Sequence, residues 1–157
     1  MNWQFCIAAA VAVFAASPAL SDVAPLEVVY HEGAVDLSLT GKPGDPEAGL
    51  KVMTTRALGN CVACHEISKL KDVPFQGNIA PPLDGVADRY SEAQLRGIVS
   101  NAKMTFDGSF MPSFYKTTGY IRPGDGYTGK AATEPLPPIL NAQQIEDVLA
   151  YLKTLKD

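Results

Sequence analysis

The segment Cys61-Val62-Ala63-Cys64-His65 constrains the fold of this chain more than any other feature. Two cysteines separated by two residues and followed directly by a histidine form the attachment motif of a c-type haem. The two thiols can add to the vinyl groups on one edge of the porphyrin, and the histidine then ligates the iron from the proximal side. The sequence therefore predicts one covalently bound haem c per chain, held by Cys61, Cys64 and His65.

Two other interpretations of the cysteine pair remain open from the motif alone. A redox-active dithiol of the thioredoxin kind uses the same spacing, and so does half of a structural zinc site. The dithiol needs a surrounding strand-helix-strand pattern, which is not evident in this sequence, and the zinc site needs two more ligands at a usable spacing. Haem attachment needs nothing further and is the interpretation that we favour.

Residues 1–21 have the features of a signal peptide. They contain no charged side chain, and an apolar run over 5–16 is followed by small residues that allow cleavage after Ala19 or Ser21. The lack of Lys or Arg before this run departs from the usual pattern. Because the run is short for a transmembrane helix, we expect a periplasmic protein with no membrane span in its mature form, with an uncleaved anchor as the alternative.

Removal of the leader would leave about 136 residues, a length that suits one domain. We divide this part into an N-terminal extension at 22–44 and a haem-binding domain at 45–157. Cys6 would be lost with the leader, so that the two thiols of the motif are the only ones left, as suits an oxidising compartment. The formal net charge of −4 disfavours nucleic acid as a partner.

Three segments predict helices, and no comparable strand pattern appears. The first begins after Asp45, an N-cap followed by Pro46, and is expected to run to Gly59. Capping boxes at Ser91 and Asn141 begin the other two. Apolar side chains recur at helical spacing in these two helices: Leu95, Ile98, Val99 and Ala102 in one, and Ile145, Val148, Leu149, Leu152 and Leu155 in the other. Residues 66–90 and 104–140 are expected to be loops, of a length that suits wrapping around a porphyrin.

A helix, the haem motif, a proline-rich loop, a middle helix, a methionine loop and a last helix, in that order, resemble the class I cytochrome c fold over residues 45–157. The resemblance implies an all-α, single cytochrome c domain with long loops. It also implies that the backbone carbonyl of Pro81 accepts a hydrogen bond from Nδ1 of His65, although an ordinary proline turn is the alternative. Gly49 and Tyr151 match the family's crossing of the first and last helices, which Met53 and Val148 would complete.

The sixth iron ligand separates an electron carrier from a haem enzyme. Met111 is followed by proline in a loop that resembles the distal-ligand loop of class I cytochromes, and Phe106, Phe110 and Phe114 could form an apolar wall there. Met104, His31 or an open position remain alternatives, and Met53 is assigned to the helix crossing. Axial ligation by His65 and Met111 favours one-electron transfer, whereas an open position would indicate a peroxidase-like enzyme.

Longer strings give a closer resemblance. Segments 77–83, 91–96, 111–115 and 139–152 together resemble the SoxX family, the monohaem subunits of SoxAX cytochrome complexes. The resemblance implies a SoxA-like second c-type cytochrome as partner, in a cysteine S-thiosulfotransferase that oxidatively attaches thiosulfate to a cysteine of a SoxYZ-like carrier. With no spare thiol, this chain would accept electrons and pass them toward a small periplasmic cytochrome, while the bond-forming site would lie on the partner.

A free-standing periplasmic cytochrome c that shuttles electrons is the alternative function. It would share every haem feature but would be a monomer. The loop 116–138, with Tyr120, Ile121 and Tyr127, is longer than a lone cytochrome needs and is a candidate interface. Lys69 and Lys71 could help to dock an acidic redox partner, although solvated loop lysines are an equally ordinary interpretation.

Overall fold

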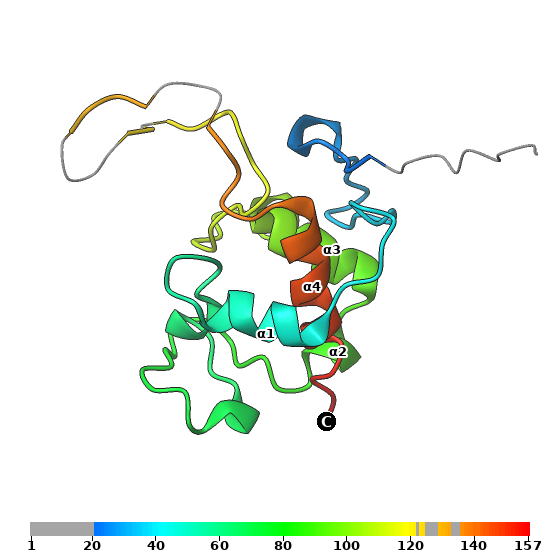
Figure 1. Cartoon of the computed structure of the whole chain (residues 1–157), viewed down its shortest axis with the longest axis vertical. Helices are drawn as coiled ribbons and strands as arrows, with labels where there is room; N and C mark the ends of the chain where they lie inside the picture. The colour runs from blue at the N-terminus through cyan, green and yellow to red at the C-terminus, as the bar shows by residue number, and fades with distance from the viewer. Residues whose placement is uncertain (1–20, 122, 125–128, 133–135) are drawn as a thin grey trace, which may run out of the picture.

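The computed structural model describes residues 21–121, 123–124, 129–132 and 136–157. In these residues the regular structure is helical, and the predicted all-α class is confirmed. The helices are α1 (Pro46–Thr54), α2 (Val86–Arg89), α3 (Glu92–Asn101) and α4 (Ala142–Leu152), shown in Figure 1. Short 3-10 helices lie at Pro25–Glu27, Cys61–Ala63, Ser68–Leu70 and Ala102–Met104.

Two sequence predictions fall on residues that the structure does not describe. The signal peptide lies outside the described residues except for Ser21, and Tyr127 of the candidate interface loop lies outside them as well. In the described segments, no helix combines the length and the apolar character needed to cross a membrane.

The predicted N-caps begin all three long helices. The side chain of Asp45 accepts hydrogen bonds from the backbone N–H groups of Glu47 and Ala48, at 2.9 and 3.5 Å. At Ser91 and Asn141 both halves of the capping box are present. The predicted helix starts are therefore confirmed. They could be predicted from the sequence because a capping side chain finds its partners within three residues along the chain.

The end of α1 differs from the prediction. The helix ends at Thr54 instead of continuing to Gly59. Beyond it, the N–H groups of Gly59 and Asn60 both donate to the carbonyl of Val52, at 3.1 and 3.4 Å, which folds the chain back in a turn. Two consecutive β-branched residues, Thr54 and Thr55, weaken helix propagation at this point. The turn therefore places the haem motif next to the C-terminal end of α1.

Helices α1 and α4 cross in the centre of the fold (Figure 1). A Cβ atom on Gly49 would lie 2.0 Å from the backbone carbonyl oxygen of Asp147, so no larger residue fits at this approach. Met53 and Val148 are fully buried, and the half-buried Tyr151 packs against the same core. The predicted helix crossing is confirmed.

The N-terminal segment 22–44, here called the strap, packs onto α3 and α4. Its side chains Val35 and Leu39 are buried in the common core. The backbone N–H of Val35 donates to the carbonyl of Ala93 on α3 at 2.9 Å. Within the strap, the N–H of Val23 donates to the carbonyl of Leu39 at 2.7 Å, which closes the segment into a loop. The sequence carried no signal for this packing.

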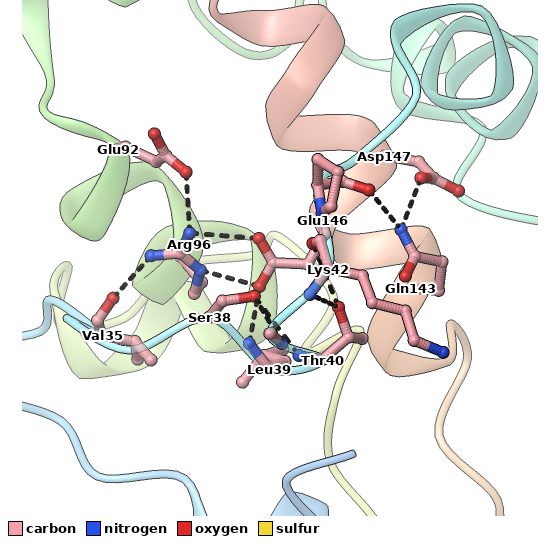
Figure 2. Close-up of polar contacts among 12 residues, drawn as sticks. Val35, Ser38, Leu39, Thr40, Lys42, Glu92, Arg96, Gln143, Glu146 and Asp147 are labelled. Carbon is pink, nitrogen blue, oxygen red and sulfur yellow. Dashed lines mark hydrogen bonds and ion pairs between the residues drawn. The ribbon is translucent and has the colours of Figure 1, made fainter. Parts of the chain in front are cut away.

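A buried ion pair joins the strap to both helices (Figure 2). Arg96 on α3 and Glu146 on α4 are each only 4% exposed. Arg96 donates Nε–H to Oε1 of Glu146 at 2.9 Å and Nη2–H to Oε2 at 3.1 Å. Its Nη1 donates to the carbonyl of Val35 at 3.0 Å, and Oε1 of Glu146 also accepts the N–H of Leu39 at 2.7 Å. This bidentate pairing compensates the cost of burying both charges.

We expect Arg96→Met to lower the free energy of unfolding of the haem-loaded protein by about 3–5 kcal/mol, because it leaves the carboxylate of Glu146 buried without its counter-ion. Lys153→Met is the matched control. Lys153 also pairs with a carboxylate, that of Glu92, but the two side chains are 50% and 44% exposed, and their pair is worth about 0–1 kcal/mol.

Denaturant unfolding of the two variants measures the difference. Adding Glu146→Leu to Arg96→Met should recover part of the loss, because no uncompensated charge then remains. If Arg96→Met and Lys153→Met lowered the free energy of unfolding by the same small amount, the structural role given to the buried pair would be contradicted.

Candidate functional site

The haem motif lies on a tight turn directly after α1. Asn60 adopts a left-handed conformation with φ of 48°, which asparagine tolerates better than most residues, and redirects the chain into the 3-10 turn Cys61–Ala63. The N–H groups of Cys64 and His65 both donate to the carbonyl of Cys61, at 3.1 and 3.0 Å. Three predicted site residues therefore share one turn, with both cysteines half-buried as free thiols.

The surroundings of the cysteine pair argue against its other interpretations. Burial raises the pKa of the Cys61 thiol to about 12, whereas a redox-active dithiol depends on a lowered pKa. Within the described residues, no group of three or more His, Cys, Asp or Glu side chains is placed to hold a metal ion, so the further ligands of a structural zinc site are not found there.

A proline-rich segment runs alongside the motif and is fixed to it through the backbone. Three N–H groups donate to carbonyls of the motif region at 2.8–3.0 Å: Gly77 to Val62, Ala80 to Cys64 and Leu83 to Glu66. The approach is so close that a Cβ on Gly77 would lie 2.0 Å from the carbonyl oxygen of Ala63. Glycine is therefore required where this segment first meets the motif.

The same segment brings the carbonyl of Pro81 to the ring of His65. The distance from Nδ1 of His65 to this oxygen is 2.7 Å. Because a carbonyl can only accept, Nδ1 carries the proton, and the lone pair of a neutral imidazole is left on Nε2 for a metal ion. Such a partner also fixes the ring orientation and raises the basicity of the ligand.

Two polar side chains that no sequence motif indicates hold this segment in place. Gln76 accepts the N–H of Ile67 and donates to the carbonyl of Leu70, both at 2.7 Å. Arg89 donates to the carbonyls of Asp84 and Pro82, at 2.6 and 2.9 Å. Neither residue belongs to a motif, since each acts on backbone groups that only the folded path of the loop brings within reach.

The candidates for the distal ligand lie in different surroundings. Met53 is fully buried at the helix crossing, and Met104 is half exposed after α3. His31 is exposed, with Nδ1 2.9 Å from the carboxylate of Asp36. Met111 is half-buried at the edge of the core, and its carbonyl accepts a hydrogen bond from Nζ of Lys103 at 2.6 Å. In Figure 1 the segments that follow α1 and α3 both lie to the left of the crossing helices.

The three phenylalanines near Met111, which were expected to form an apolar wall, differ in their exposure. Phe114 is buried in the core, and Phe110 is fully exposed. Phe106 packs edge-on against Tyr90, with ring centroids 6.4 Å apart. The difference arises because Phe110 and Phe114 lie on either side of Met111 along an irregular loop, in which spacing does not determine direction.

Of the two lysines proposed to dock a redox partner, Lys69 donates a hydrogen bond to the backbone carbonyl of Thr154 at 3.4 Å.

The residues present fit a haem bound through the motif. Cys61 and Cys64 are unbridged thiols, and the donor at Nδ1 of His65 is already used, which leaves Nε2 as the ligating atom. Ile79, between the anchored residues Gly77 and Ala80, is 83% exposed and offers an apolar side chain beside the motif.

We expect Gly77→Ala to displace the proline-rich segment from the motif, because the added Cβ meets the Ala63 carbonyl. The haem-loaded variant should lose about 1–3 kcal/mol of unfolding free energy, the usual cost of overpacking. Denaturant unfolding and the yield of protein with covalent haem measure the effect. Asn78→Ala, at the exposed neighbouring position, is the control and should behave like the original protein. Identical behaviour of the two variants would show that the close approach is unimportant.

Comparison with known proteins places these features in a family. The family model for cytochrome c matches residues 46–156. Among solved structures, one chain of the crystal structure of SoxXA from P. pantotrophus superimposes with a TM-score of 0.84 at 69% sequence identity. The alignment covers 87% of this chain and 100% of that chain. No curated protein sequence matches.

The match to the cytochrome c model spans most of the chain, and the family binds its haem c covalently. The identity to the SoxXA chain extends over that chain's whole length. The resemblance read from the sequence is thereby confirmed: this chain belongs to the cytochrome c family and, within it, to the SoxX cytochromes.

Proposed function

We propose that this chain is the electron-accepting subunit of a two-cytochrome complex that oxidises thiosulfate. The observation that carries the proposal is the 69% identity, over its full length, to a chain from the SoxXA complex. At that level of identity, the residues that contact a partner and those that hold the haem are expected to be largely shared. The partner would be a SoxA-like second c-type cytochrome.

We further propose that Cys61 and Cys64 bind the haem covalently, with His65 and Met111 as its axial iron ligands. The hydrogen bond between Nδ1 of His65 and the Pro81 carbonyl supports the proximal assignment, because it leaves Nε2 free to ligate. The half-buried position of Met111, on a loop tied to the 3-10 helix Ala102–Met104, supports the distal assignment. A haem with histidine and methionine ligands stores and releases one electron at a relatively high potential.

The overall reaction assigned to the complex is the joining of thiosulfate to the thiol of a SoxYZ-like carrier. A sulfur–sulfur bond forms, the S–H bond of the carrier breaks, one proton is released and two electrons are removed. This chain has no thiol outside the motif among its described residues. Because His65 and Met111 would also occupy both axial positions of the iron, we assign the bond-forming site to the partner, and this chain would conduct electrons one at a time toward a small periplasmic cytochrome.

The proposed location is the periplasm, after removal of residues 1–21 as a signal peptide. The strap at 22–44 and the cytochrome c domain at 45–157 would then form the mature protein. A c-type haem motif and an apolar leader followed by small residues support this arrangement together.

We place part of the partner interface on the loop 116–138. Its described segments extend away from the helices in Figure 1. Ile121 is 97% exposed. The hydroxyl of Tyr120 donates a hydrogen bond to the carbonyl of Lys116 at 2.8 Å, and the centroid of its ring lies 5.0 Å from Nζ of Lys116. An apolar side chain presented on a projecting loop supports burial against a second protein.

Met111→Ala should remove the weak long-wavelength sulfur-to-iron band of the oxidised protein, lower the reduction potential and allow cyanide to bind readily. The reason is that the alanine supplies no ligand at the sixth position. Optical spectra and cyanide titration of the holoprotein measure these changes. Met104→Ala is the matched control and should keep the band. If the two outcomes are reversed, Met104 is the ligand, and the Met111 assignment is wrong.

The functional proposal predicts that the protein copurifies with a second c-type cytochrome, through an interface of about 1,200 Å² or more. Only this pair, supplied with the thiol-bearing carrier, should reduce an acceptor cytochrome when thiosulfate is added. Omission of the carrier is one control, and Met111→Ala in the intact complex, which should slow turnover, is another. A lone monomer that exchanges electrons with unrelated donors, with no stable cytochrome partner, would favour the free-standing shuttle.

A further inference from the structure

Tyr115 lies four residues after Met111 and joins the methionine loop to the strap. Its side chain is 5% exposed, and its hydroxyl donates to the backbone carbonyl of Val23 at 2.6 Å. The two residues are 92 positions apart in the sequence. Burial raises the pKa of the Tyr115 hydroxyl and the nearby Asp22 carboxylate adds to the effect, so the group remains a donor at neutral pH.

The carbonyl that receives this hydrogen bond is itself held firmly. The N–H of Val23 donates to the carbonyl of Leu39, and the N–H of Leu39 donates to the buried carboxylate of Glu146, both at 2.7 Å. Glu146 is in turn paired with Arg96. Tyr115 is therefore connected through the strap to the ion pair between α3 and α4, rather than to a loose terminal segment.

Other contacts tie the methionine loop to α3 and to the 3-10 helix Ala102–Met104 that follows it. At Met111 itself, Nζ of Lys103 in this 3-10 helix donates to the backbone carbonyl at 2.6 Å. After it, Ser113 donates its hydroxyl to the side-chain carbonyl of Asn101 at 2.7 Å, and the N–H of Tyr115 donates to the carbonyl of Ser100 at 3.0 Å. The hydroxyl of Tyr115 thus provides an anchor for this loop on a different element, the strap.

We propose that Tyr115 is a positioning residue for Met111, and that the strap braces the methionine loop through it so that the sulfur stays on the iron. The inference rests on the proposed role of Met111 as distal ligand. Dissociation of the sulfur requires the loop to move, and each hydrogen bond that must break or strain in that motion opposes it. Loss of the Tyr115 hydroxyl removes one such restraint while the aromatic ring still fills its site.

The test is Tyr115→Phe in the full, haem-loaded, oxidised protein, with imidazole as the probe. At saturating imidazole the binding rate is limited by loss of the methionine ligand, and we expect it to rise about fivefold to tenfold, the equivalent of one net hydrogen bond. Thr154→Val is the control, because it also removes a hydroxyl that donates to a backbone carbonyl, that of Tyr151 at 2.7 Å, outside this connection. The control should exchange ligand at the original rate.

A second variant examines the strap side of the same contact. A chain that begins at Ala24, exported behind a foreign leader, lacks Val23 and should show a similar acceleration. Combined with Tyr115→Phe, it should add little more, since both changes remove the same hydrogen bond. Additive effects, or a lowered thermal midpoint with an unchanged exchange rate, would overturn the positioning role and leave Tyr115 as a purely structural residue.

Met111→Ala in the same experiment separates failure of this inference from failure of the ligand assignment. If Met111→Ala keeps the sulfur-to-iron band, Met111 is not the ligand, and the brace proposal falls with it. If Met111→Ala loses the band but Tyr115→Phe exchanges imidazole like the original protein, the ligand assignment stands and only the brace is wrong.

Discussion

The buried pair between Arg96 and Glu146 is the interaction on which the arrangement of this protein depends. A guanidinium and a carboxylate that are both removed from water must be paired closely, and here the pairing also uses backbone groups of Val35 and Leu39 in the strap. The neighbouring carboxylate of Asp147 accepts the N–H of Asp45 at 2.9 Å, at the start of α1. Two consecutive acidic residues of α4 thereby hold both the strap and the first helix, while α3, which carries Arg96, supports the methionine loop.

The haem site is built by a different kind of contact. The proline-rich segment follows the motif through backbone hydrogen bonds, and only a glycine allows the approach at Gly77. Side chains then stabilise this path from outside, with Gln76 and Arg89 bound to carbonyls of the loop. The result is a histidine whose proton position is determined by its partner. Such an arrangement suits a rigid electron-transfer site, in which little reorganises when charge changes.

Much of the fold could be predicted because its signals are local. Caps at Asp45, Ser91 and Asn141 are satisfied within three residues, and they placed the helix starts correctly. The end of α1 was wrong because apolar spacing alone does not show where a helix stops, and the turn formed around the Val52 carbonyl ends it earlier. For the candidate site, the motif and the proline segment were evident, whereas the supporting roles of Gln76 and Arg89 were not. The different exposures of the three phenylalanines near Met111 were not evident either, because their spacing along an irregular loop does not indicate which of them is buried.

The sequence by itself determined the haem motif, the order of helices and the family, because these depend on residue types at short, fixed spacings. The close passage of α1 against α4 was also expected, because Gly49 and Tyr151 match the helix crossing of class I cytochromes c, and the structure leaves no room for a Cβ at Gly49. Only the tertiary structure decided that the strap belongs to the core, that Arg96 is buried and that Tyr115 reaches Val23. In each of these cases the partner lies 50 or more residues away. A charged or polar side chain in a helix or loop carries no mark of such a partner, and its burial becomes favourable only once the chain has brought the two together.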